Sequence, residues 1–130
     1  MIVINFKNYV TGEKTIYLAK LIEKYLPKSI VAVPAADIFE TTAETKLRVF
    51  AQHVDYHEKG RATGFIVPED VKEAGAVGTL LNHSEHRLKF NVLKKCVERA
   101  HKTDLKIILC AANAAEARKF ISLKPYGIAF

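Results

Sequence analysis

The chain has 130 residues, which predicts a single domain, residues 1–130, because this length fits one unit and can bury a real core. Its 20 Lys and Arg against 14 Asp and Glu give a net charge of +6, which suits nucleic acid or a phosphorylated metabolite. The lysines are scattered rather than grouped with aromatic residues, and no apolar run approaches the ~20 residues that span a bilayer, so we expect neither a nucleic-acid nor a membrane partner.

Short runs rich in Val, Ile and Leu alternate with longer amphipathic stretches along the chain. The pattern predicts six strands, at 2–6, 30–34, 48–52, 76–81, 106–110 and 126–130. It predicts five helices between them, at 13–26, 36–45, 68–74, 87–102 and 114–123. Continuous apolar strands that alternate with helices are typical of a parallel sheet covered by helices, either an open doubly wound sheet or a (β/α) barrel. In both folds the site lies at the carboxyl ends of the strands.

A dense polar cluster follows the fourth predicted strand without a spacer: residues 82–87 are Asn-His-Ser-Glu-His-Arg. The first predicted strand adds Asn5 and Lys7, which share one face of an extended chain because they are two residues apart. Both positions lie where a site is expected. From the residues alone, Lys7 is either an exposed edge charge or an anion site, and His83 is either a site residue or an ordinary loop histidine.

Other chemically capable residues have simpler interpretations. Four residues with metal-ligating side chains follow the third strand: His53, Asp55, His57 and Glu58. Their alternating spacing could bring the two imidazoles together at a metal ion, but a hydrated polar loop is the simpler interpretation. His86 and Arg87 are interpreted as a solvated helix start. The two cysteines have no CxxC spacing and indicate a reducing, cytoplasmic setting.

Four segments together resemble triosephosphate isomerase, in particular its shorter, archaeal-type branch. They are "NFK" at 5–7, "FAQHVD" at 50–55, "GFIVPEDVKEAGAVGTLLNHSEHR" at 64–87 and "ILCAAN" at 108–113. The resemblance implies an α/β fold, a partial TIM (β/α)8 barrel with about five βα units plus a sixth strand and helices outside a parallel sheet. It also implies the interconversion of dihydroxyacetone phosphate and glyceraldehyde 3-phosphate through an enediolate, in glycolysis and gluconeogenesis, without a cofactor or metal.

The resemblance further implies roles for single residues. Asn5 and Lys7 match the Asn-x-Lys pair of the first strand, which binds substrate, and the lysine neutralises phosphate and developing enediolate charge. His83 matches the electrophilic histidine, so Lys7 and His83 are the expected catalytic residues. Glu85 is expected to pair with the lysine and orient it. Ser84 suits the N-cap of the helix predicted to start here, whose dipole would lower the pKa of His83.

The archaeal-type pattern places its catalytic glutamate after the sixth strand, in a Glu-Pro-Pro-Glu segment, whereas this sequence stops at Phe130, one residue earlier. The glycine-rich phosphate-binding turns after strands seven and eight are also missing, and a full barrel needs ~200 residues or more. The resemblance therefore predicts a truncated, inactive isomerase chain.

A partial barrel also leaves two edge strands unpaired, so we expect self-association as a homo-oligomer or a complementary C-terminal half as partner. Gln52 and His53 match a segment that shapes the dimer interface in many family members. The alternative is a non-catalytic half-barrel that acts as an assembly or interaction module.

Overall fold

The structure, a computed structural model, covers residues 1–130 and contains six strands and five α-helices in strict alternation. The strands are β1 (Val3–Asn5), β2 (Ile30–Val33), β3 (Arg48–Ala51), β4 (Gly78–Leu81), β5 (Lys106–Cys110) and β6 (Gly127–Ala129). The helices are α1 (Glu13–Tyr25), α2 (Ile38–Glu44), α3 (Pro68–Glu73), α4 (Phe90–Lys102) and α5 (Ala114–Ile121), and a short 3₁₀ turn, η1 (Ala35–Asp37), precedes α2. The alternation predicted from hydrophobic periodicity is confirmed.

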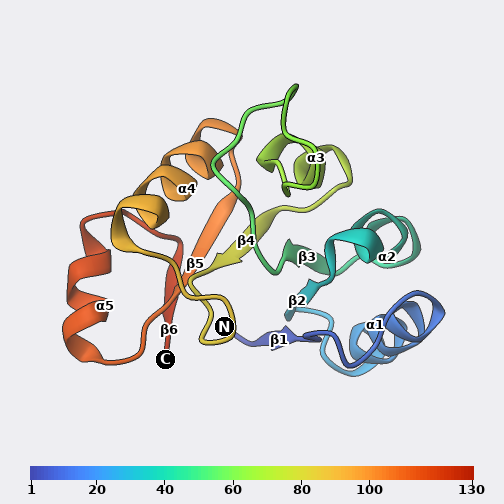
Figure 1. Cartoon of the computed structure of the whole chain (residues 1–130). Coiled ribbons are helices and arrows are strands. Elements are labelled where there is room, and N and C mark those ends of the chain that lie inside the picture. Colours follow the sequence, from blue (N-terminus) through green and yellow to red (C-terminus); the bar gives the residue numbers. More distant parts are fainter.

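All six strands form one parallel sheet in the order β1-β2-β3-β4-β5-β6. Each strand is therefore hydrogen-bonded to its neighbours in the sequence, whereas an open doubly wound sheet reverses its order at a switch point. Figure 1 shows the strands curling into an arc with the helices on its outer side. Of the two folds that the sequence left open, the curled sheet is the partial (β/α) barrel.

Alternating strand residues divide the apolar core between the two faces of the sheet. Val31 and Val33 of β2 belong to the large outer core beneath the helices, while Ile30 and Ala32 belong to a small inner cluster on the concave face. The inner cluster comprises Ile30, Ala32, Phe50, Leu80 and Ile108. Because successive side chains point to opposite faces, a strand covered on both sides is buried along its whole length, as β2 and β4 are.

The curl brings the two ends of the sheet towards each other. The Met1 side chain lies beside Gly127, the first residue of β6, so closely that a Cβ there would lie 3.1 Å from Met1 Cε. β1 and β6 nevertheless each pair with a single strand, β2 and β5 respectively. The sheet therefore ends in two edge strands that face each other across the open side of the arc.

One predicted helix boundary is wrong in a way that matters for the site. Helix α4 begins at Phe90, not at residue 87, and its N-cap position is Lys89, not Ser84. Ser84 instead lies in a tight turn in which the His86 N–H donates to the His83 carbonyl over 2.8 Å. The physical reason is that Leu88 and Phe90 pack against the outer core, which keeps the chain extended up to Lys89. His83 is therefore not at the N-terminus of α4, and the expected helix-dipole effect on it has no structural basis.

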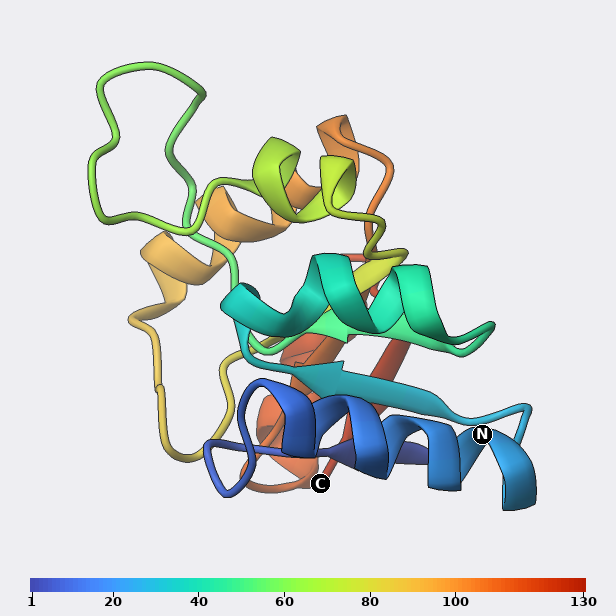
Figure 2. The ribbon, with the colours of Figure 1, turned by 90° about the vertical axis from the view of Figure 1, so that its right-hand side faces the viewer.

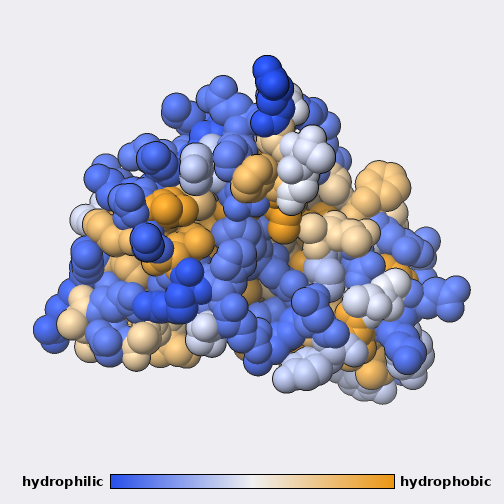
Figure 3. Space-filling model, viewed as in Figure 1, coloured by the Kyte–Doolittle hydropathy of each residue, from blue (hydrophilic) through white to orange (hydrophobic).

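The loops at the carboxyl ends of the strands gather on one side of the molecule, the left-hand side of Figure 2, where the loop between β3 and α3 projects furthest. The face shown in Figure 3 is hydrophilic through its middle, with hydrophobic side chains in smaller groups on both sides. None of the helices has the length and hydropathy that crossing a membrane requires.

Candidate active site

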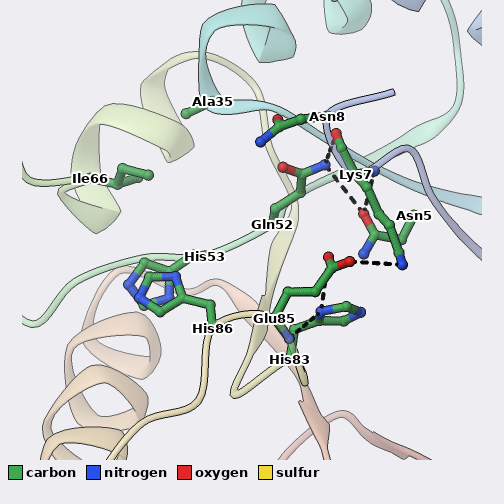
Figure 4. A pocket seen from close by; sticks show the side chains of 10 residues that line it. All are labelled: Asn5, Lys7, Asn8, Ala35, Gln52, His53, Ile66, His83, Glu85 and His86. Atoms are coloured by element: carbon green, nitrogen blue, oxygen red, sulfur yellow. Dashed lines mark hydrogen bonds and ion pairs between the residues drawn. The ribbon is translucent and has the colours of Figure 1, made fainter. Parts of the chain in front are cut away.

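A pocket of about 350 Å³ lies at the carboxyl ends of β1, β3 and β4 (Figure 4). Its lining is mostly polar: Asn5, Lys7, Asn8, Ala35, Gln52, His53, Ile66, His83, Glu85 and His86. Parallel strands bring their carboxyl ends to one edge of a sheet, which is why segments separated by up to about eighty residues meet here. Asn5, Lys7, His83 and Glu85, four of the five expected site residues, line this one pocket.

Backbone and amide contacts fix Lys7 at the end of β1. Its backbone takes a left-handed conformation with φ of 49°, and its N–H donates to Asn5 Oδ1 over 2.9 Å. The Gln52 side-chain amide donates to the Lys7 carbonyl over 2.7 Å and to Asn5 Oδ1 over 3.2 Å. Asn5 and Gln52 thus stabilise an otherwise unfavourable conformation, which aims the Lys7 side chain into the pocket.

The Lys7 ammonium contacts the Glu85 carboxylate across the pocket, with 2.9 Å between Nζ and Oε1. This hydrogen bond, together with the charge of Glu85, raises the pKa of Lys7 above its ordinary value. The same hydrogen bond holds the pKa of Glu85 below its ordinary value. Both partners are therefore charged at neutral pH, and the pair presents an oriented ammonium group to the pocket.

His83 has a defined hydrogen-bonding direction. The backbone N–H of Glu85 donates to His83 Nδ1 over 3.2 Å, while Glu85 Oε2 lies 3.5 Å from the same nitrogen. We assign Nδ1 as the acceptor because the amide contact is shorter and an N–H can donate only to an unprotonated nitrogen. In this tautomer the imidazole is neutral and Nε2 carries the hydrogen. His83 can then donate a hydrogen bond from Nε2 to an oxygen.

The turn that carries His83 is anchored at its start by Asn82. Asn82 is buried, with 1% of its surface exposed, and has a left-handed φ of 63°, a conformation that asparagine tolerates better than most residues. Its side chain donates to the Cys110 carbonyl over 3.0 Å and accepts the Leu88 N–H over 2.9 Å. These contacts hold both ends of the turn against β5.

Arg87 also differs from its prediction, because it is not a freely solvated helix start. Its guanidinium group forms an ion pair with Glu116 of α5 and donates to the Asn82 carbonyl. Ser84 and Arg87 line a neighbouring cavity of about 390 Å³ on the concave face, along with Cys110 and residues of both edge strands. Ser84, expected to support the site as a helix cap, thus lies beside the pocket rather than among its lining residues.

Several pocket residues have no local signal in the sequence. Ile66 and Ala35 reach the pocket from the β3–α3 loop and from η1 (Figure 4). His86 stacks on His53, with 4.1 Å between ring centroids. His57, a candidate metal ligand by spacing, instead stacks on Phe65 with 3.7 Å between centroids. A pattern search cannot find such contacts, because they join residues that are far apart in the chain or that depend on the path of one loop.

Comparison with known sequences and structures points to one family. A family model for triosephosphate isomerase matches residues 1–124. The chain is 42% identical to a triosephosphate isomerase of Saccharolobus solfataricus, over 98% of this chain and 59% of that protein. It is 44% identical to one from Sulfolobus acidocaldarius, over 85% of this chain and 50% of that protein. The chain thus spans between half and three fifths of these curated relatives.

Solved structures give the same fold. A crystal structure of triosephosphate isomerase from Bartonella henselae superposes with a TM-score of 0.76, covering 91% of this chain and 54% of that one. Sequence identity is 24%, so this likeness concerns the fold. The predicted barrel-type α/β architecture is confirmed.

Proposed function

Because the chain belongs to the triosephosphate isomerase family, we propose that its pocket is part of a site that interconverts dihydroxyacetone phosphate and glyceraldehyde 3-phosphate. The observation that carries the proposal is the convergence of Lys7, His83 and Asn5 in one pocket at the strand ends. Such a reaction moves a proton between adjacent carbons, so it needs a base and donors placed where enediolate charge develops. The proposed site supplies the donors.

Lys7 and His83 are the proposed catalytic residues. The Lys7 ammonium, oriented by Glu85 at 2.9 Å, neutralises substrate phosphate and the growing negative charge. The Nε2–H of neutral His83 donates to the substrate oxygen on which that charge develops, since Nδ1 is occupied by the Glu85 amide. Asn5 binds substrate beside the lysine and holds the Lys7 backbone in place. Neither role uses a cofactor.

The base is the part of the mechanism that the pocket of these 130 residues does not supply. Glu85 is the one carboxylate among the lining residues, and its Oε1 is engaged by Lys7. Glu69 is engaged by Arg99 over 2.5 Å, on α3 and outside the pocket. Because misplacing a reacting group by about 1 Å can cost ~100-fold in rate, neither carboxylate is a substitute. We therefore infer that the 130-residue chain alone is inactive.

The second candidate function is a non-catalytic half-barrel that acts in assembly. Two edge strands and a concave apolar cluster favour it, because unpaired strand edges readily accept another chain. The proposed partner is a second copy or a complementary C-terminal half. The proposed setting is the cytoplasm, in glycolysis and gluconeogenesis, and the two free cysteine thiols support a reducing compartment.

A coupled isomerase assay tests the proposal. The purified 130-residue chain and its His83→Gln variant are compared, alone and after mixing with the C-terminal part of the S. solfataricus relative, which this chain does not match. We expect no turnover from the chain alone, and turnover in the mixture that the His83→Gln variant loses. Turnover by the chain alone that disappears in the variant would contradict the missing base. A mixture that forms a folded complex but has no turnover would favour the assembly function.

A further inference from the structure

Two histidines from separate strand ends form a ring stack at the edge of the pocket. His53 follows β3 and His86 lies in the turn after β4, and their ring centroids are 4.1 Å apart with an interplanar angle of 32° (Figure 4). The two residues are 33 positions apart in the sequence, so the stack joins two otherwise separate loops. The proposed catalytic roles do not use it.

His53 is the fixed member of the stack. Its side chain is 8% exposed, and its Nε2 lies 3.2 Å from Asp55 Oδ1. Asp55 is itself held in place, because its Oδ2 accepts the Ile66 N–H and its own N–H donates to the Ile66 carbonyl, both over 2.8 Å. The carboxylate therefore binds the Nε2–H of a neutral His53 and orients the ring. A buried, oriented imidazole is a rigid surface for another ring.

His86 is the exposed member, and it is directly connected to the turn that carries His83. Its backbone N–H donates to the His83 carbonyl over 2.8 Å, which closes the turn. The other anchors of this turn point elsewhere: Asn82 and Arg87 bind towards β5 and α5, and Glu85 binds Lys7 at the end of β1. The His86 ring therefore provides the contact of this turn on the β3 side.

Whether the two imidazole rings stay in contact depends on how many of them are protonated. Burial lowers the pKa of His53, and the charge of His86 lowers it further, while Asp55 raises it only in part. Two protonated rings 4.1 Å apart would repel each other in a partly buried place. The other titratable groups that line the same pocket are Lys7 from the β1 end, and His83 and Glu85 from the same turn as His86. Behind Asp55, the Cys96 thiol of α4 is near enough that the Asp55 charge helps to raise its pKa.

Among the titratable groups at this edge of the pocket, the two stacked rings are the pair that joins the two loops. Lys7 and Glu85 are paired with each other, which moves the pKa of each away from this range. Burial raises the pKa of the Cys96 thiol to about 11, so it stays neutral. Histidine is the side chain whose ordinary pKa lies closest to mildly acidic conditions.

We propose that His53 and His86 are positioning residues that form a pH-sensitive contact, in which their neutral rings hold the turn carrying His83 beside the β3–α3 loop and a second proton on the pair releases it. The consequence for turnover rests on the proposed isomerase function. The contact itself is measured without substrate, so the two proposals fail independently. An inactive mixture in the isomerase assay overturns the proposed function and leaves this contact untouched.

The test is amide hydrogen exchange of residue 86 in the 130-residue chain, at pH 7.5 and pH 5.0, expressed as protection relative to the intrinsic rate. His86→Phe keeps an aromatic ring but cannot be protonated, and His101→Asn removes an exposed histidine of α4 as a matched control. We expect the natural chain and His101→Asn to lose about tenfold of their protection at pH 5.0, which corresponds to one pKa unit of coupling. His86→Phe should keep its protection at both pH values.

Two results would overturn the proposal: full protection of the natural chain at pH 5.0, or an equal loss in His86→Phe. An NMR titration of the natural chain keeps the test decisive if His86→Phe does not fold. In that titration the two coupled rings should take up protons in two separate steps, with the loss of amide protection following the second. A single step at the ordinary histidine pKa for both rings would contradict the stack.

Discussion

At the scale of single residues, the site depends on short polar contacts that compensate for unfavourable conformations. Lys7 and Asn82 both have left-handed backbones, with φ of 49° and 63°. The Gln52 side-chain amide stabilises Lys7, and the side-chain amide of Asn82 stabilises Asn82 itself. Strain of this kind persists only where the surroundings hold it, and it commonly gathers at functional sites. Here it aims the Lys7 ammonium and the His83 ring into the same pocket.

Replacing Glu85 with Gln should lower the pKa of Lys7 towards its ordinary value of 10.5. The Glu85 hydrogen bond and charge are the largest causes of the raised value, and the amide of Gln removes the charge. The measurement is an NMR titration of the Lys7 side chain, with Glu44→Gln as control because Glu44 pairs with Lys20 in a similarly exposed site. A Lys7 pKa that does not move in Glu85→Gln would contradict this account.

The Lys7–Glu85 pair also determines how the stability of the folded chain changes with pH. Glu85 has a lowered pKa in the folded chain, so its contribution to stability is present above the ordinary carboxyl range and is lost as pH falls through that range. Because the Lys7 and Glu85 side chains are 35% and 57% exposed, solvent screens the interaction. Glu85→Gln should therefore change the pKa of Lys7 while leaving the unfolding midpoint at pH 7 almost unchanged.

At the scale of elements, helix α1 takes its N-terminal cap from another part of the chain. Its own N-cap position is Gly12, which has no side chain to offer, and Asp37 of η1 supplies the carboxylate instead. Asp37 is buried and accepts the Gly12 N–H over 3.0 Å and the Thr15 hydroxyl over 2.8 Å. This contact joins the starts of α1 and α2.

Replacing Asp37 with Ala should destabilise the chain by about 2–3 kcal/mol, because it leaves a buried hydroxyl and an N–H without partners. Urea unfolding at pH 7 measures the change. Adding Thr15→Val to Asp37→Ala removes the orphaned hydroxyl, so the double variant should recover part of the loss. A double variant that loses as much as the two single changes combined would contradict the buried-donor explanation.

Strand β4 begins with a glycine that makes room for the inner cluster. Gly78 lies opposite Phe50 in the register, and a Cβ at Gly78 would collide with the Phe50 ring and with the Lys106 carbonyl. Gly78→Ala should therefore cost about 1–3 kcal/mol through overpacking. Gly127→Ala on β6 is the matched control, because its Cβ would meet the flexible end of Met1 and should cost less than about 0.5 kcal/mol. Equal losses in urea unfolding of the two variants would contradict this packing argument.

The sequence predicted the elements well and their junctions poorly. Apolar runs identified all six strands, and a strand buried on both faces, such as β2, leaves a continuous apolar signal. The start of α4 was missed because Lys89 offers no side-chain cap, so helical spacing alone extended the helix too far towards the N-terminus. The polar cluster after β4 was evident, but the stack of His86 on His53 joins distant residues and leaves no local pattern. The assignment of His83 and Lys7 came from the family resemblance.

At the scale of the whole molecule, the curled sheet has an open side. The inner cluster is buried by its own strands, while Val3 of β1 and Ala129 of β6 pack against it only in part, and both line the cavity on the concave face. An edge strand presents unpaired N–H and C=O groups, so partly covered apolar side chains beside it favour pairing with another chain. The open side is therefore where a second copy or a complementary half would add.

Replacing Ala129 with Lys should weaken that association, because a charge on an edge strand opposes strand addition. Sedimentation velocity over a range of concentrations should show the natural chain becoming larger as concentration rises, and Ala129→Lys should show a much smaller change. Ile121→Lys is the matched control, because Ile121 is 64% exposed on the outer helix α5 and is not part of an edge strand. It should associate as the natural chain does.

The same experiment distinguishes the two proposed partners. Adding the C-terminal part of the S. solfataricus relative should convert self-associated chain into a one-to-one complex if a complementary half completes the arc, because two further strands would pair both edges at once. If a second copy is the natural occupant, the added part should leave the oligomer unchanged. If the natural chain stays monomeric at every concentration and does not bind the added C-terminal part, the edge strands do not pair with another chain. The curl that brings Met1 against Gly127 would then be enough to shield them.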